Sequence, residues 1–432
     1  MKDFVRVFHT GSIDDPPGKE GLASLTAALM AGGATRRRGY KQILEDCFEM
    51  ATGVEQQTDK ELTVFYGSAH SDHEERFGAI FRECIEEPAF SEEDFARVKD
   101  EHLNFLRVEL GGNNDEELAK EVLYDCIFAA HPYGHHCVGT VEGLEAITLE
   151  DVRAFHAAHF QAPGAKKKVS PPKSIQGLHA TLLDKPEARS VAISFGHPIP
   201  ITRGHADYPA LLVAQAWLGQ HRNGGRLFDQ IREVRGLNYG DYAYLEYFPR
   251  GMYQFEPDPC LARQQQIFQV WIRPVVWEKS HFAVRLALHE IASLQAKGLS
   301  VEDFERTRLF LRKYSKLLVK TNSLRERYAI DSAFYSTPEY TEYIDQSLQA
   351  LTLDQVNAAA RKYLSTENLQ LVAVGPRMEE WGQLLLSGAP TPITYEISVP
   401  DEVLAEDAIV ASRPWPQATF EISSKYSSNL GT

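Results

Sequence analysis

The sequence predicts an α+β fold made of two homologous domains, each an antiparallel sheet with helices packed on it, which arose by internal duplication and are joined by a linker. Two observations predict this fold. Short β-rich runs occur together with longer helical patterns in each half of the chain, as in α+β domains. Motifs from the first half also return in the second half in the same order, and 432 residues are enough for two large domains.

The repeat consists of three matched segments. In the first, SEEDFAR from Ser91 returns as SVEDFER from Ser300, an offset of 300 − 91 = 209. The others are LEAITLEDVRAF from Leu144 with LQALTLDQVNAA from Leu348, where 348 − 144 = 204, and the QI-x-E segments from Gln42 and Gln230, where 230 − 42 = 188. In the first two matches, Ser or Thr stands where a helix N-cap is expected. Three matches in order favour a duplicated domain.

Each half contains strand-like and helix-like stretches in a similar order. The expected strands cover residues 4–8, 62–67, 190–195, 267–272 and 369–374. The expected helices cover residues 21–31, 40–50, 92–110, 116–129 and 149–159 in the first half, and 208–219, 226–234, 277–296, 301–319 and 353–363 in the second. Beyond Gly375, we expect a terminal helix in MEEWGQLLL and an exposed acidic stretch in DEVLAEDA.

The two halves are not equally complete. A strand-like NLQLVAVGP follows the last of these second-half helices, whereas the corresponding place in the first half reads APGAKKKVSPPKS. The first half is therefore expected to lack its final strand. The lysine run with its flanking prolines indicates a linker. We expect a first domain at 1–162, a linker at 163–185 and a second domain at 186–432.

Composition excludes several classes of protein. Subtracting 60 acidic from 45 basic residues gives a net charge of −15, which disfavours nucleic acid and anionic membranes as partners. No stretch approaches the roughly 18 apolar residues of a membrane span. The start lacks a secretory signal, so the chain as written is expected to be cytoplasmic, or periplasmic if its natural start lies upstream. Five scattered cysteines indicate reduced, mostly buried thiols.

Three segments resemble the pitrilysin and insulinase family of metallopeptidases, which is itself built of paired α+β repeats. PGKEGLASLTAALMAGGAT from Pro17 is similar to the family's helix with the inverted zinc motif His-x-x-Glu-His. HPYGHHCVGTVEGL from His131 is similar to a later loop, and GGRLFDQIREVRGLNYG from Gly224 to the second-half signature. The resemblance covers nearly the whole chain in the expected order.

The zinc chemistry of that family needs two imidazoles one helical turn apart, with a glutamate between them to activate water. This sequence has Ser24, Ala27 and Ala28 at those positions. The resemblance places a third, distal ligand near Asn104 or Phe105, and neither is a carboxylate. Glu101 and Glu109 lie nearby, but one carboxylate does not hold zinc. We therefore expect no metal site in this chain, with Leu22, Leu25, Leu29 and Met30 forming the apolar face of a buried helix.

Other histidines could in principle replace the lost ligands. His70 with His73 and His156 with His159 have a spacing that suits one metal on a helix, but neither pair has a clear third ligand. His131, His135 and His136 stand beside Cys137, where a thiol and a base would suggest a nucleophile. Neighbours in sequence rarely point at each other as a catalytic dyad requires. Satisfied structural histidines are the favoured interpretation.

The second-half signature keeps Arg232 seven residues before Tyr239. The resemblance implies that such an arginine and tyrosine reach across the cleft to the peptide held at the zinc. Arg232 could donate forked hydrogen bonds to peptide carbonyls, and Tyr239 could stabilise developing negative charge. The alternative is a solvated arginine and a core tyrosine. Arg235 is the competing choice for the arginine.

Two functions follow from the resemblance. The first is a zinc-free, alone inactive subunit of a heterodimeric peptidase, like the non-catalytic chains of bacterial heterodimeric peptidases and of the mitochondrial processing peptidase. Such a chain would lend Arg232 and Tyr239 to a partner that keeps His-x-x-Glu-His and binds zinc, with a peptide as substrate. The second is a non-catalytic scaffold or peptide-binding protein, like the related core subunits of the respiratory cytochrome complex.

Overall fold

The computed structural model describes residues 1–220, 224–246, 258–396 and 398–423. The strands are β1 Lys2–Phe8, β2 Glu55–Thr58, β3 Thr63–Ala69, β4 Leu178–Asp184, β5 Val191–Ile199, β6 Asp241–Tyr244, β7 Gln266–Val275, β8 Leu369–Gly375 and β9 Ala418–Ile422. The first-half helices are α1 Leu22–Gly32, α2 Tyr40–Glu49, α3 Glu74–Glu86, α4 Glu92–Asn104, α5 Asp115–Ile127, α6 Val141–Ala146 and α7 Leu149–His159. The second-half helices are α8 Tyr208–Gln215, α9 Trp277–Lys297, α10 Val301–Leu318, α11 Asn322–Tyr335, α12 Tyr340–Ala350, α13 Leu353–Tyr363, α14 Met378–Ser387 and α15 Asp401–Ala411.

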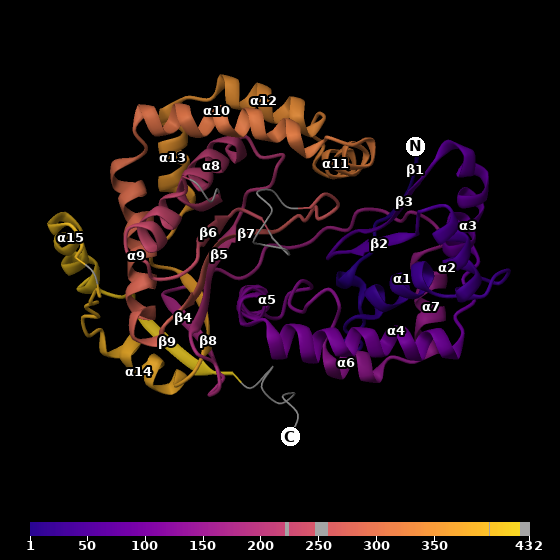
Figure 1. Ribbon diagram of the computed structural model, residues 1–432, viewed down its shortest axis with the longest axis horizontal. Coiled ribbons are helices and arrows are strands. Elements are labelled where there is room, and N and C mark those ends of the chain that lie inside the picture. Colours follow the sequence, from indigo (N-terminus) through magenta and orange to yellow (C-terminus); the bar gives the residue numbers. More distant parts are fainter. Residues whose placement is uncertain (221–223, 247–257, 397, 424–432) are drawn as a thin grey trace.

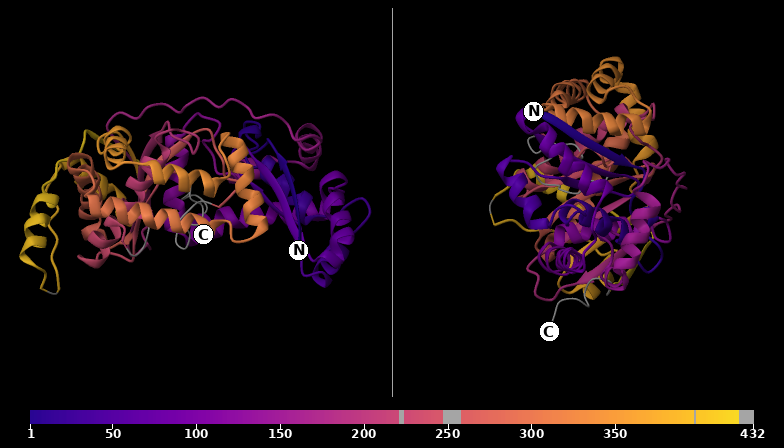
Figure 2. Two further views of the ribbon diagram at one scale, coloured as in Figure 1. Left: turned by 90° about the horizontal axis from the view of Figure 1, so that it is seen from above. Right: turned by 90° about the vertical axis from the view of Figure 1, so that its right-hand side faces the viewer.

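Each half has its own sheet. Among the described residues, the first sheet has three antiparallel strands in the order β1-β3-β2, and the second has six in the order β6-β7-β5-β8-β4-β9. The second sheet is mixed, because β4 runs parallel to both β8 and β9. The two halves lie side by side in Figure 1 and together form a crescent when seen from above in Figure 2.

The second sheet is covered on both faces, which joins the halves. The apolar side chains of α8, α9 and α13 belong to the core of the second half on one face. On the other face, α5 of the first half packs against β5 and β8. Leu183, Val372 and Val374 of the second sheet consequently belong to the same buried cluster as α1, α5 and α7. A single core thus extends from the first half onto the second sheet.

The predicted α+β fold with two related domains is confirmed, and residues 160–177, all of them described, contain no final strand for the first half, as expected. Three expectations are wrong. The second sheet is not purely antiparallel, because β4 pairs in parallel with β8 and β9. The linker cannot extend to residue 185, because residues 178–184 form β4, an interior strand of the second sheet. The stretch DEVLAEDA is part of α15, so the helix of residues 378–387 is not the terminal one. The acidic run by itself does not reveal that one of its carboxylates, that of Asp407, is buried against Arg235.

Helix boundaries follow ordinary capping chemistry. The repeated segments begin α4 and α10, where the hydroxyls of Ser91 and Ser300 accept a hydrogen bond from the third helical N–H. Thr148 and Thr352 cap α7 and α13 with complete capping boxes. The expected helix at 92–110 ends its regular part at Asn104 and continues as π-helix over Phe105–Asn113.

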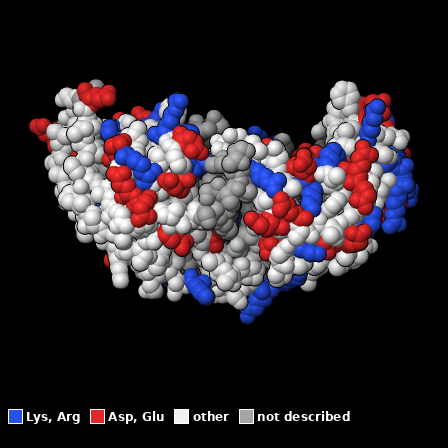
Figure 3. All heavy atoms as spheres, turned by 90° about the horizontal axis from the view of Figure 1, so that it is seen from below, with Lys and Arg blue, Asp and Glu red and all other residues white. Residues whose placement is uncertain are grey.

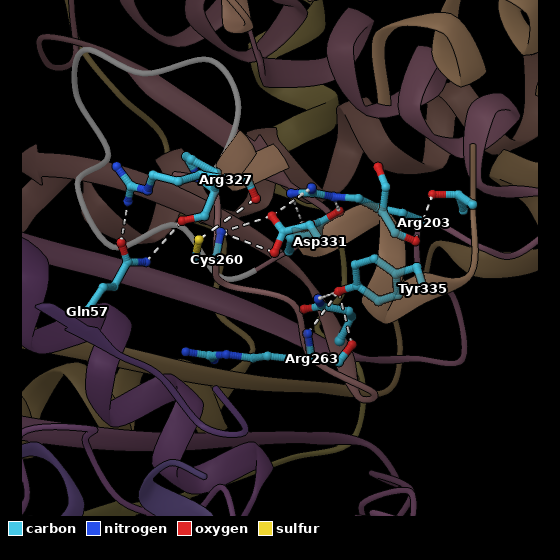
Figure 4. Close-up of polar contacts among 12 residues, drawn as sticks. Gln57, Arg203, Cys260, Arg263, Arg327, Asp331 and Tyr335 are labelled. Carbon is cyan, nitrogen blue, oxygen red and sulfur yellow. Dashed lines mark hydrogen bonds and ion pairs between the residues drawn. The ribbon is translucent and has the colours of Figure 1, made fainter. Parts of the chain in front are cut away.

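A buried polar junction connects the two halves, and Figure 4 shows the part of it where Arg263 meets Tyr335. Arg263, from the second half, donates two hydrogen bonds to Asp59 of the first half, with Nε to Oδ2 at 2.6 Å and Nη2 to Oδ1 at 2.5 Å. Burial by itself would raise the pKa of Asp59, but the Arg263 guanidinium holds it below its ordinary value. Tyr335 accepts a hydrogen bond from the Arg263 backbone N–H at 2.9 Å, so α11 is tied to the same segment.

A second buried group lies beside this junction in the second half. Arg203 pairs with both carboxylate oxygens of Glu246 at 3.0 Å and with Asp331 at 3.2 Å. Asp331 also accepts the backbone N–H of Cys260 at 3.0 and 3.1 Å. The segment that carries Cys260 and Arg263 is therefore fixed by charged groups on both sides.

Two buried histidines predict that the protein loses stability in mild acid. Burial lowers the pKa of His281 to about 3 and that of His197 to about 4, whereas an unfolded histidine titrates near 6.5. Below about pH 6.5 the unfolded chain therefore takes up protons that the native imidazoles refuse, and each group lowers stability by about 1.4 kcal/mol per pH unit. Urea unfolding between pH 7 and pH 5 measures this loss. His281→Asn, which keeps an N–H for the Trp381 carbonyl, should make the pH dependence shallower.

Candidate functional site

The helix at the position of the zinc motif is firmly held. Gly21 precedes α1 with a φ of 108°, and a Cβ there would lie 2.5 Å from the Val138 carbonyl oxygen, so only glycine fits. The buried carboxylate of Asp15 accepts the backbone N–H groups of Gly21 and Ala23, both at 2.7 Å. His135 contacts the same carboxylate at 3.1 Å. The start of α1 is thereby fixed without any metal ion.

The side chains on α1 do not fit zinc. Ser24 is buried and its Oγ lies 3.2 Å from Nε2 of His102 on α4, while Ala27 and Ala28 present only methyl groups. The other ring nitrogen of His102 lies 3.0 Å from the Val98 carbonyl, and burial lowers the pKa of His102. The contact between Ser24 and His102 joins α1 to α4. Within the described ranges, no group of three or more His, Cys, Asp or Glu side chains is placed to hold a metal.

The predicted distal position is equally unsuitable. Asn104 and Glu101 are exposed, and Phe105 packs its ring 5.7 Å from that of His136. Glu109, also exposed, lies on the π-helical turn at the rim of a cavity.

The remaining histidines and Cys137 have structural roles. His156 is buried beneath Phe90, and His159 stacks on Phe155 with ring centroids 4.2 Å apart. His70 caps the short 3-10 turn that contains His73 by accepting the N–H of Asp72. Cys137 donates to Asp59 at 3.6 Å, and burial raises the pKa of its thiol to about 11. A buried thiol with a raised pKa argues against the nucleophile interpretation.

The second-half signature forms a fixed loop that presents Tyr239 outward. Gly236 adopts a φ of 60° after the helical turn Phe228–Glu233, and Leu237 is buried. Asn238 donates to Asp241 at 2.8 Å and to the Arg273 carbonyl at 3.0 Å. The residues just before Tyr239 are held in place, and the Tyr239 side chain between them and the following strand is 72% exposed to solvent. It is not the core tyrosine of the alternative interpretation.

Arg232 lies next to Tyr239. The Arg232 guanidinium carbon is 4.8 Å from the centre of the Tyr239 ring and 4.7 Å from that of Phe228. Arg273 approaches the same tyrosine at 5.8 Å and also donates a forked pair of hydrogen bonds to Glu116 of α5. Tyr239 therefore lies beside a link between the second sheet and the first half.

Arg235 has a different role. It is buried and pairs with Asp407 at 2.7 Å and with Glu406 at 2.6 Å, both on α15. It also donates to Gln230 at 2.9 Å. These contacts attach α15 to the signature loop, so that Arg232, and not Arg235, is the signature arginine beside the exposed tyrosine.

Sequence reasoning missed a cavity of about 360 Å³ where the halves meet. Its first-half walls come from β2, the π-helical turn, α5 and the loop at 136–138, and Asp258 and Leu261 line it from the second half. Glu117 and Glu121 project into it from α5, and burial raises the pKa of Glu117 although Lys120 pairs with it at 2.7 Å. Their spacing of four on a helix capped by Asn114 was the available sequence signal. Carboxylates in such a cavity can accept hydrogen bonds from a ligand.

Charged side chains elsewhere are mixed. On the face in Figure 3, lysine and arginine are interspersed with aspartate and glutamate over both halves. Among the described helices, none is both long and apolar enough to cross a bilayer.

The two-domain fold is that of a metallopeptidase, but its α1 helix lacks the side chains that would bind the metal. Residues 5–141 match the family model of insulinase (peptidase family M16), and residues 163–311 match that of the peptidase M16 inactive domain. The chain belongs to the insulinase family, peptidase family M16, and its second half matches the inactive-type domain.

Relatives and solved structures agree with this assignment. An uncharacterized zinc protease of Rickettsia bellii is 24% identical over 78% of this chain and 84% of its own length. An uncharacterized zinc protease of Bacillus subtilis is 20% identical over 85% of this chain and 91% of its own. The crystal structure of a peptidase M16 inactive domain from Pseudomonas fluorescens has a TM-score of 0.73 at 22% identity, covering 87% of this chain and 92% of that one. A Helicobacter pylori protease has a TM-score of 0.69 at 14% identity, covering 87% and 93%.

Proposed function

We propose that this chain is a zinc-free subunit of a peptidase, which supplies Arg232 and Tyr239 to a peptide bound by a zinc-bearing partner. The observation that carries the proposal is the combination of an exposed Tyr239 beside a half-buried Arg232, which also pairs with Glu233 at 3.3 Å, with an α1 helix that offers only Ser24, Ala27 and Ala28. In this proposal the partner is a homologue with an intact His-x-x-Glu-His motif. The zinc ion and the general base belong to the partner.

The geometry favours a role in peptide binding for two reasons. An exposed tyrosine hydroxyl can donate to a peptide carbonyl, and a neighbouring guanidinium strengthens such an interaction with developing negative charge. Leu237 and Arg235 also anchor the loop to the core and to α15, which leaves the exposed side of Tyr239 accessible to a peptide.

Metal analysis and reconstitution test the proposal together. The purified chain is expected to contain far less than one zinc per molecule and to cleave no quenched fluorescent peptide by itself. Mixing it with the purified His-x-x-Glu-His homologue from the same cell should produce cleavage well above the sum of the separate chains. A stable mixture that binds peptides without this gain would instead support the scaffold function. Stoichiometric zinc in the isolated chain would contradict the proposal.

A further inference from the structure

The two related sheets differ at one defined place. By duplication, β1-β3-β2 of the first half corresponds to β5-β7-β6 of the second. In the second half, β8 follows α13 and pairs antiparallel with β5 from Ala192 to Gly196. In the first half, the helix equivalent to α13 is α7, and residues 160–177 after it contain no strand. Within the described residues, β1 consequently pairs with β3 alone.

The hydrogen-bond pattern shows which groups of β1 face the empty position. The N–H of Asp59 donates to the Leu62 carbonyl in the β2–β3 turn, so alternate residues from Leu62 onward on β3 face β2. The others, residues 63, 65, 67 and 69, face β1 and pair with its residues 8, 6, 4 and 2. The peptide groups of Asp3, Val5 and Val7 therefore point away from the sheet.

The linker occupies only the end of this edge. The N–H of His9, the next residue of the outward-pointing set, donates to the Pro163 carbonyl at 2.7 Å. The chain then crosses to the second half, where Lys166 donates to the Phe334 carbonyl. A row of N–H and C=O groups that find no strand partner among the described residues, on a seven-residue strand without proline, is a template for a further strand.

Two exposed side chains at this edge are basic, whereas Asp3, the one acidic residue of β1, accepts a hydrogen bond from Ser68. Arg6 is exposed, and in the described part of the chain it forms no ion pair, its guanidinium lying 5.4 Å from the centre of the Phe8 ring. Lys2 is exposed too and reaches Glu74 only at 3.6 Å. On a protein with a net charge of −15, two basic residues along one free edge favour an incoming strand with an acidic residue.

We propose that the free edge of β1 docks an extended segment of a partner polypeptide, which adds to the first sheet as an antiparallel strand with an acidic side chain near Arg6. The docked strand takes the position that β8 takes beside β5. The proposal does not depend on Arg232 and Tyr239, because β1 belongs to the sheet of the first half, whereas both of those residues lie in the second half.

A fluorescent peptide that copies residues 367–376, the β8 segment with its leading Glu367, is a suitable probe. Fluorescence anisotropy with the full chain should show saturable binding that a scrambled peptide does not show. Val5→Pro removes one outward N–H that an edge strand can spare, and should weaken binding at least tenfold. Val5→Ala, the matched control, should keep the affinity within about threefold. Equal binding by Val5→Pro, or none by the wild-type chain, would overturn the proposal.

Hydrogen exchange gives a second reading that needs no substitution. The peptide should slow exchange of the Asp3, Val5 and Val7 amides and leave those of Phe4 and Arg6 unchanged, since the latter already bond to β3. Protection spread evenly over both sets would contradict edge pairing. Self-association without peptide that Val5→Pro abolishes would assign the edge to a second copy of this chain and overturn the assignment to a partner.

Discussion

Arg263→Met is expected to lower the free energy of unfolding by about 3–5 kcal/mol, because it leaves the buried carboxylate of Asp59 without its cation. Arg263 and Asp59 are both almost fully buried and share two short hydrogen bonds across the junction between the halves. Removing one member of such a pair retains the cost of burying the other charge. Urea unfolding followed by circular dichroism measures the change at neutral pH.

The double substitution Arg263→Met with Asp59→Leu should recover a large part of this loss, because apolar side chains of similar volume often replace a buried ion pair at little cost. Arg37→Met is the matched surface control. Arg37 pairs with Glu87 in an exposed position, so its loss should leave the urea midpoint nearly unchanged. A single Arg263→Met variant as stable as the Arg37→Met control would mean that the junction does not depend on this pair.

The Asp59–Arg263 pair also marks the limit of sequence-based prediction for this fold. Periodicity and capping residues locate most helices and five strands, because these signals are local. The partners of Asp59 and of Arg235 lie 204 and 172 residues away in the chain, and no local pattern connects them. For the same reason the sequence pattern places β4 in the linker: the prolines and lysines that precede it are stronger local signals than its short apolar run.

The candidate site, too, could be predicted from the sequence only in part. The loss of zinc ligands at Ser24, Ala27 and Ala28 is visible in sequence, since it needs only the register of one helix. The contact of Ser24 with His102 is not visible, because it depends on how α1 packs on α4. For Arg232 and Tyr239 the spacing was informative, but the exposure of Tyr239 depends on how Asn238 and Leu237 are anchored.

Tyr239→Phe is expected to reduce kcat of the reconstituted peptidase by about 10²–10³, which is typical for the loss of one donor to an oxyanion. KM should change little, because the hydroxyl is most effective where negative charge develops in the transition state. Arg232→Ala should lower kcat/KM and also raise KM, since a forked donor to peptide carbonyls contributes to ground-state binding as well. Steady-state kinetics with one fluorogenic peptide separates the two effects.

Arg235→Lys is the control for damage to the loop, because it keeps a cation near Asp407 while changing a residue that the structure assigns to packing. Its effect should appear in the urea midpoint more than in kcat. Full reconstituted activity of Tyr239→Phe, with assembly intact by sedimentation, would remove the tyrosine from the chemistry and leave the signature loop as an attachment for α15. The two variants thus distinguish a tyrosine that acts on the peptide from a loop that only shapes the surface around it.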